Sequence, residues 1–156
     1  MRLLSLLLLL SLSGLALADA QIDRLLEADE EPAGVVFEII EDDDDALGWA
    51  LTKIARLSAR LRERFPDLPI AVVTHGREQF GLLADEAEGL LAPIHDRAKQ
   101  LRVDDIDLHV CGVHAGWDGY TPEDFPAYVD VSASGPAQIN DYRNLGFELI
   151  LLQGPD

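Results

Sequence analysis

Five apolar runs of strand length, separated by stretches with helical periodicity, constrain the fold of this chain more than any other feature. The runs span residues 34–40, 70–76, 108–113, 128–131 and 147–152. The longer runs are continuously apolar rather than alternating, and this is typical of strands that are buried on both faces of a parallel sheet. The pattern therefore predicts a buried, mostly parallel sheet.

Helical patterns fill the segments between these runs. In the first segment, Leu47, Leu51 and Ile54 recur at the spacing of one helix face. The other helical segments are 77–83, 90–101 and 134–145, and a further helix start lies at Thr121. Because strands joined through helices run parallel and place helices on both faces, we predict an α/β three-layer sandwich with a mostly parallel five-stranded sheet.

The first twenty residues have the composition of a cleaved signal peptide. An apolar segment over 3–17 is followed by Ala16, Ala18 and Ala20, which offer small residues at two signal-peptidase sites. The segment is about 15 residues long, shorter than the roughly 20 of a membrane-spanning helix. We therefore predict that 1–20 is removed and that the product is periplasmic or secreted, with no membrane span after processing. Residues 21–33 are then expected to form a loosely docked N-terminal arm, and 34–153 the α/β domain.

The charge of the chain excludes one class of partner. Its formal net charge is −17, from 29 acidic and 12 basic residues. Such a protein repels polyanions, so we expect neither nucleic acid nor an anionic membrane surface as a partner.

An acidic run over residues 41–45 precedes the first predicted helix. Carboxylates are ligands for calcium, but no glycine-punctuated loop accompanies the run. We interpret it instead as an aspartate N-cap together with charges that favour the positive end of the helix dipole.

Cys111 is the only cysteine of the chain and stands at the end of the third apolar run. Outside the cytoplasm a thiol commonly forms a disulfide, and this one has no partner in its own chain. It is therefore a small buried hydrophobe, joined to another molecule, bound to a metal, or kept as a reactive group. Ligands of open parallel sheets gather at the carboxyl ends of the strands, which is where Cys111 is expected.

In four segments the chain resembles the DsrE/DsrF-like proteins, small single-domain α/β proteins associated with bacterial sulfur metabolism. The segments are 35–40, 72–76, 108–112 and 134–147, taken in this order. The resemblance extends over residues 34–152. It implies a five-stranded parallel fold that assembles into homo-oligomers.

The resemblance also implies sulfur handling. In active members a cysteine after the third strand accepts sulfane sulfur as a persulfide and passes it on, and Cys111 occupies the matching position. From its place at the end of the second run, His75 is the candidate base, and His114 lies in the following loop near the acceptor. The chain differs from active members in residues 112–117 and in its export signal. The donor and acceptor stay open, as does the choice between a sulfurtransferase and a carrier, and no cofactor is predicted.

Two other functions fit the same residues. His109, Cys111 and His114, with His75 as a fourth ligand, offer the thiolate and imidazoles that copper or zinc prefer. The alternative function is thus a non-catalytic binding module for a soft metal or small ligand. A third is an oligomeric scaffold, in which a lone histidine at a strand end is only a structural hydrogen-bonding residue.

Aromatic residues gather after the cysteine. They are Trp117, Tyr120, Phe125 and Tyr128. They are expected to roof a pocket over the thiol, to form an oligomer contact, or to pack a loop onto the core.

Overall fold

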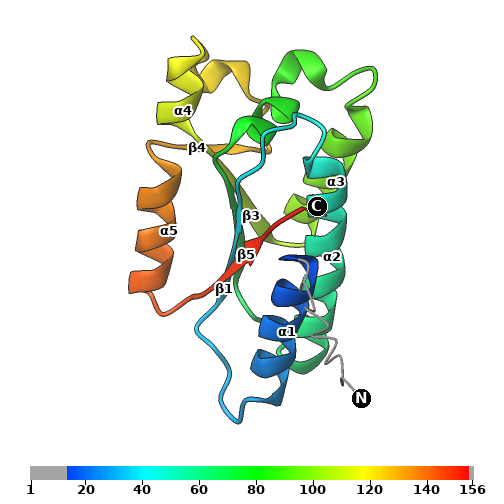
Figure 1. Ribbon diagram of the computed structural model, residues 1–156, viewed down its shortest axis with the longest axis vertical. Helices are drawn as coiled ribbons and strands as arrows, with labels where there is room; N and C mark the ends of the chain where they lie inside the picture. The colour runs from blue at the N-terminus through cyan, green and yellow to red at the C-terminus, as the bar shows by residue number, and fades with distance from the viewer. Residues whose placement is uncertain (1–13, 155–156) are drawn as a thin grey trace, which may run out of the picture.

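A computed structural model describes residues 14–154 of the protein (Figure 1). Its strands are β1 (Val35–Ile39), β2 (Ile70–Thr74), β3 (Ile106–Cys111), β4 (Asp130–Ser132) and β5 (Glu148–Leu152). Its α-helices are α1 (Gly14–Glu27), α2 (Leu47–Arg64), α3 (Ala92–Val103), α4 (Gly112–Trp117) and α5 (Gly135–Asn144). Three 3₁₀ turns, η1 (Arg77–Leu82), η2 (Ala84–Glu86) and η3 (Pro122–Asp124), complete the edge to which the strands point.

The five strands form one sheet in the order β4-β3-β2-β1-β5, and every neighbouring pair is parallel. In Figure 1, α1, α2 and α3 lie on one side of the sheet and α5 on the other. The predicted α/β three-layer sandwich with a five-stranded parallel sheet is confirmed.

Alternate residues of the central strands divide between two apolar clusters, as the pleat of a strand requires. Val35, Phe37 and Ile39 of β1 face α2 and belong to the large core. Val36 of the same strand belongs to a small cluster on the α5 side with Ala71, Val73 and Ile139. The sheet is therefore buried on both faces, but unequally.

The long helix α2 forms because its apolar residues fall on one stripe. Leu47, Leu51, Ile54, Leu57 and Leu61 are all fully buried, at helical spacing. The helix ends where the chain reaches 66–69, a segment with two prolines. This burial anchors the α2 face of the sheet.

The predicted loosely docked arm at 21–33 is wrong for its first residues, which continue α1 as far as Glu27. Ile22 is fully buried against the core, and Asp19 accepts hydrogen bonds from Lys53 at 2.6 Å and Arg56 at 3.0 Å. Asp23 accepts another from Arg60 at 2.6 Å. The reason is that apolar residues at helical spacing continue beyond the signal-like segment and face α2, whose outer basic residues attract the aspartates.

The start of α1 overlaps the end of the predicted signal peptide. The boundary at residue 20 falls inside α1, and Ala18, next to one predicted cleavage site, is fully buried. Residues 1–13 of the signal-like segment lie outside the described residues. Within 14–154, no helix is long and apolar enough to cross a membrane.

The acidic run at 41–45 was predicted to cap α2 with an aspartate side chain, and this prediction is wrong. The N-cap of α2 is Ala46, which makes no side-chain cap hydrogen bond. Instead the backbone carbonyls of Asp43 and Asp45 accept hydrogen bonds from the N–H groups of Ala46 and Gly48. Backbone carbonyls therefore accept the hydrogen bonds at the start of α2 that an aspartate side chain was expected to accept. The carboxylates of these aspartates lie at the surface.

Candidate functional site

The structure brings His75 and Cys111 together at the carboxyl edge of the sheet. Cys111 is the last residue of β3, and His75 follows the last residue of β2, its neighbour. Both lie beneath the first residue of α5. A Cβ atom on Gly135 would stand 2.6 Å from the Cβ of His75 and 3.3 Å from the Cβ of Cys111. Only glycine therefore fits at this position, and the thiol and the imidazole are neighbours under the helix start.

Glu38 completes this group, although sequence reasoning missed it. Its Oε1 lies 2.8 Å from Nε2 of His75, and both side chains are largely buried. The carboxylate fixes the orientation of the ring. Cys111, His75 and Glu38 thus lie at the carboxyl ends of the neighbouring strands β3, β2 and β1, and the carboxylate orients the imidazole ring. The only available signal was a single charge within an otherwise apolar strand.

The Cys111 side chain is nearly covered, with 5% of its surface exposed. Among the described residues its thiol makes no hydrogen bond, but its backbone N–H donates to Oε1 of Gln79 at 2.8 Å. Gln79 is fully buried, and its Nε2 has no partner within residues 14–154. The backbone of Cys111 is therefore held firmly, and a donor group lies in the same buried region.

His114 lies in the helix α4 and not, as was expected from the sequence, in a loop after β3. Its Nδ1 donates to the backbone carbonyl of His75 at 2.8 Å, and its Nε2 lies 3.7 Å from Asp118. Its ring contacts Phe80 and Trp117, with centroids 5.3 and 5.6 Å away. His114 therefore links α4 to the end of β2 and supports the backbone of His75.

His109 lies on the same face of β3 as Cys111 but has its own partners. Its Nε2 is 2.8 Å from the hydroxyl of Tyr142, and its Nδ1 is 3.0 Å from the hydroxyl of Ser132. Burial lowers the pKa of His109 and raises that of Tyr142 to about 12. Both side chains are therefore neutral near pH 7 and form a hydrogen-bonded network between β3, β4 and α5.

The two histidines of the predicted metal site hydrogen-bond to separate partners. His109 is engaged by Tyr142, and His114 by the backbone of His75. Over the described range 14–154, no group of three or more His, Cys, Asp or Glu side chains could hold a metal ion.

A second buried carboxyl, Glu78, fixes the backbone around the site. It accepts hydrogen bonds from the N–H of Glu41 at 2.7 Å, the N–H of Gly76 at 3.0 Å and the hydroxyl of Thr74. Burial raises the pKa of this carboxyl, against the effect of its donors. The ends of β1 and β2, and therefore the position of His75, are tied together through one side chain.

The aromatic residues after Cys111 separate into two groups. Phe125 is buried in the core, and the Tyr128 hydroxyl lies 2.6 Å from Nδ1 of the buried His95. Trp117 is 79% exposed, and Tyr120 packs on Phe80 with a centroid distance of 5.3 Å. Neither group roofs Cys111, which α5 covers instead.

Fold and site together define a three-layer α/β protein with a parallel five-stranded sheet and a lone cysteine beside a histidine at its carboxyl edge. No family model and no curated protein matches the chain.

Two solved structures show the same fold. One is a protein of unknown function, MTH1491 from Methanobacterium thermoautotrophicum, with a TM-score of 0.62 and 23% identity over 75% of this chain and 96% of that one. The other is the ychN protein from E. coli, with a TM-score of 0.57 and 15% identity over 76% of this chain and 97% of that one. At these identities the likeness concerns the fold.

Proposed function

We propose that this protein carries sulfane sulfur as a persulfide on Cys111. The observation that carries the proposal is the position of Cys111 and His75 at the neighbouring ends of β3 and β2, both beneath Gly135, with the His75 ring held by Glu38 at 2.8 Å. The first turn of α5 adds the positive end of a helix dipole above the thiol, which favours a thiolate or persulfide anion. The resemblance of residues 34–152 to the DsrE/DsrF-like proteins supports this chemistry.

In the proposed reaction His75 takes the proton of the Cys111 thiol. The thiolate attacks the outer sulfur of a donor that contains a sulfur–sulfur bond. A new bond forms between Sγ and that sulfur, the donor bond breaks, and its electron pair leaves with the rest of the donor. With thiosulfate the leaving group is sulfite, and with a polysulfide it is a polysulfide one atom shorter. An acceptor thiolate reverses these steps.

The proposal includes export and assembly. Processing after Ala18 or Ala20 would place the carrier in the periplasm or outside the cell, where its donor and acceptor would be small molecules or other exported proteins. N-terminal sequencing of the native protein is expected to begin at Asp19 or Gln21, and recovery of Met1 would contradict export with cleavage. Light scattering of the purified protein tests the proposed homo-oligomer.

The direct test is intact mass after treatment with polysulfide or thiosulfate. A carrier gains about 32 Da per sulfur atom, and reductant removes the gain. Cys111→Ser is expected to abolish it. His75→Ala and Glu38→Gln are expected to slow it, whereas His95→Gln, which changes a histidine on the other side of the sheet, serves as the matched control. A folded protein whose Cys111 never gains mass would refute the proposal.

The burial of Cys111 favours one second candidate, an oligomeric scaffold without sulfur chemistry. A thiol that is 5% exposed also fits a packing role. In that case neither mass gain nor copurifying copper or zinc is expected, and Cys111→Ala leaves every solution property except stability unchanged.

A further inference from the structure

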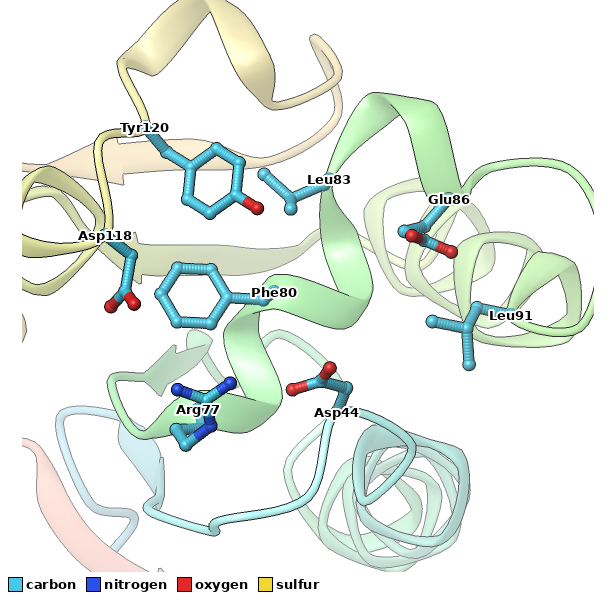
Figure 2. A pocket seen from close by; sticks show the side chains of 8 residues that line it. All are labelled: Asp44, Arg77, Phe80, Leu83, Glu86, Leu91, Asp118 and Tyr120. Atoms are coloured by element: carbon cyan, nitrogen blue, oxygen red, sulfur yellow. The ribbon is translucent and has the colours of Figure 1, made fainter.

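Gln79 is a fully buried polar side chain at the carboxyl edge of the sheet, and it belongs to η1, which follows β2. Because a 3₁₀ helix has three residues per turn, Arg77 and Phe80 share one face of η1, and Gln79 lies on another. Figure 2 shows Arg77 and Phe80 beside a surface cavity of about 170 Å³, which Gln79 does not line. Gln79 instead contacts the end of β3, where its Oε1 accepts the backbone N–H of Cys111 at 2.8 Å.

The hydrogen bond to Cys111 determines which way the Gln79 carboxamide faces. A backbone N–H is a donor, so the atom that meets it must be Oε1 and not Nε2. Nε2 is bonded to the same carbon as Oε1 and therefore lies in the same buried region at the end of β3. Within residues 14–154 this Nε2 has no hydrogen-bond partner. A buried amide donor without an acceptor destabilises a protein, so such a group calls for an explanation, and a bound ligand is one.

The chemistry of Cys111 can supply the acceptor that Gln79 lacks. A neutral thiol is only a weak acceptor. A persulfide anion instead carries its charge on an outer sulfur, one sulfur–sulfur bond of about 2.05 Å beyond Sγ. Hydrogen bonds to a charged acceptor are roughly twice as strong as neutral ones. Persulfide formation therefore creates a strong acceptor on the residue that Gln79 already contacts.

We infer that Nε2 of Gln79 binds the outer, anionic sulfur of the Cys111 persulfide, so that the two residues form a subsite for one terminal sulfur atom. The inference rests on the proposed function and gives a role to a buried donor that the proposed reaction does not use. One end of the carboxamide holds the backbone of Cys111, and the other end holds the transferred sulfur. His75 takes the proton of the thiol, whereas Gln79 stabilises the sulfur-loaded product.

Sulfur exchange with glutathione persulfide, followed on the full protein by intact mass, tests the inference. The Cys111 thiolate attacks the outer sulfur of the probe, the sulfur–sulfur bond of the probe breaks, and glutathione leaves as the thiolate, so no oxidant is needed. Gln79→Met removes the donor, because methionine is also unbranched and has no N–H. This variant is expected to lower the equilibrium ratio of persulfide to thiol on Cys111 about tenfold.

A matched control and a second measurement separate sulfur binding from a structural role. Gln138→Met is the same substitution on α5, where Gln138 contacts Ser132, and it is expected to leave the ratio unchanged. In the wild type, sulfur loading is expected to raise the melting temperature, because the buried amide gains its acceptor. This rise should be absent in Gln79→Met.

Failure of this inference and failure of the proposed function give different results. A wild type that never gains about 32 Da on Cys111 refutes the proposed function, and this inference with it. If the wild type and Gln79→Met reach the same ratio, or sulfur loading raises both melting temperatures equally, Gln79 only holds the backbone and the inference is overturned. Should Gln79→Met not fold, Gln79→Glu keeps an acceptor for the Cys111 N–H but replaces the amide donor with a carboxylate. It is expected to lower the ratio at least tenfold, and a wild-type ratio would overturn the inference.

Discussion

The two faces of the sheet differ in what they bury. On the α2 side the central strands present apolar residues apart from Thr74 at the end of β2, and α2 buries five leucine and isoleucine side chains against them. On the α5 side the apolar cluster has four buried residues, and polar side chains continue the same strands toward the carboxyl edge. α5 itself buries only Gly135 and Ile139. One face stabilises the fold, and the other holds the polar groups of the candidate site.

This difference has a consequence for access to Cys111. A helix with few buried apolar contacts can separate from the sheet at a lower free energy than one with many. Because α5 begins directly over His75 and Cys111, a local opening of its first turn exposes the thiol without unfolding the α2 side. The burial of Cys111 is therefore compatible with slow, gated reactivity.

The largest expected effect contrasts the two helices. Ile54→Ala on α2 is expected to lower the free energy of unfolding by about 4 kcal/mol, and Ile139→Ala on α5 by about 2 kcal/mol. The reason is that Ile54 lies within the large core, whereas the site of Ile139 can relax toward solvent. Urea denaturation measures both values. Equal losses of free energy in the two variants would contradict the expectation that the α2 face contributes more to stability than the α5 face.

A smaller effect is expected from Gly135→Ala, which tests α5 as the cover of the thiol. The new Cβ forces the helix start away from His75, so the free energy of unfolding should fall by about 2 kcal/mol and native labelling of Cys111 by iodoacetamide should accelerate. Gly48→Ala is the matched control, because a Cβ there meets nothing within 4 Å. It should stabilise α2 by up to about 1 kcal/mol without changing the labelling rate. Unchanged labelling in Gly135→Ala would show that another route leads to Cys111.

A third prediction uses pH to examine the polar side of the sheet. Burial lowers the pKa of His109 in the folded protein, so below about 6.5 the unfolded chain binds a proton that the folded one does not. The contribution of neutral His109 to the free energy of unfolding is complete above that pH. It is lost as the pH falls toward the pKa of His109 in the folded protein. Between pH 7.5 and 5.5 the loss should be about 1 kcal/mol greater for the wild type than for His109→Gln. Urea denaturation of both proteins at both pH values measures this difference. Equal losses of free energy in the wild type and His109→Gln would contradict the expectation.

The smallest effect is expected where α1 meets α2 at the surface. Asp23→Asn breaks the contact with Arg60, in which both side chains are partly exposed, and should cost no more than about 0.5 kcal/mol. Thermal unfolding with and without added salt measures it. A loss comparable to that of Ile139→Ala would mean that α1 is held mainly by charge rather than by the burial of Ile22.

Particular residues explain which features the sequence could predict. The apolar runs at 34–40 and 70–76 predicted β1 and β2 because a strand buried on both faces is apolar along most of its length. The pair of Glu38 and His75 could not be predicted, since it joins residues far apart in the chain and depends on β1 lying beside β2. The prediction of Cys111 and His75 at one edge needed only the parallel direction of their strands. α1 was missed because a signal-like composition conceals the amphipathic pattern that ends at Glu27.

The place of β5 in the sheet also governs how the chain can fold. β1 pairs with β5 through Val35 and Glu148, which are 148 − 35 = 113 positions apart. One side of β1 therefore stays without a hydrogen-bonding neighbour until nearly all of the described chain has been synthesised. Such distant pairing slows folding, and an open strand edge is prone to intermolecular association. A nascent or truncated chain lacking 148–152 is therefore expected to leave one edge of β1 open to intermolecular pairing until β5 covers it.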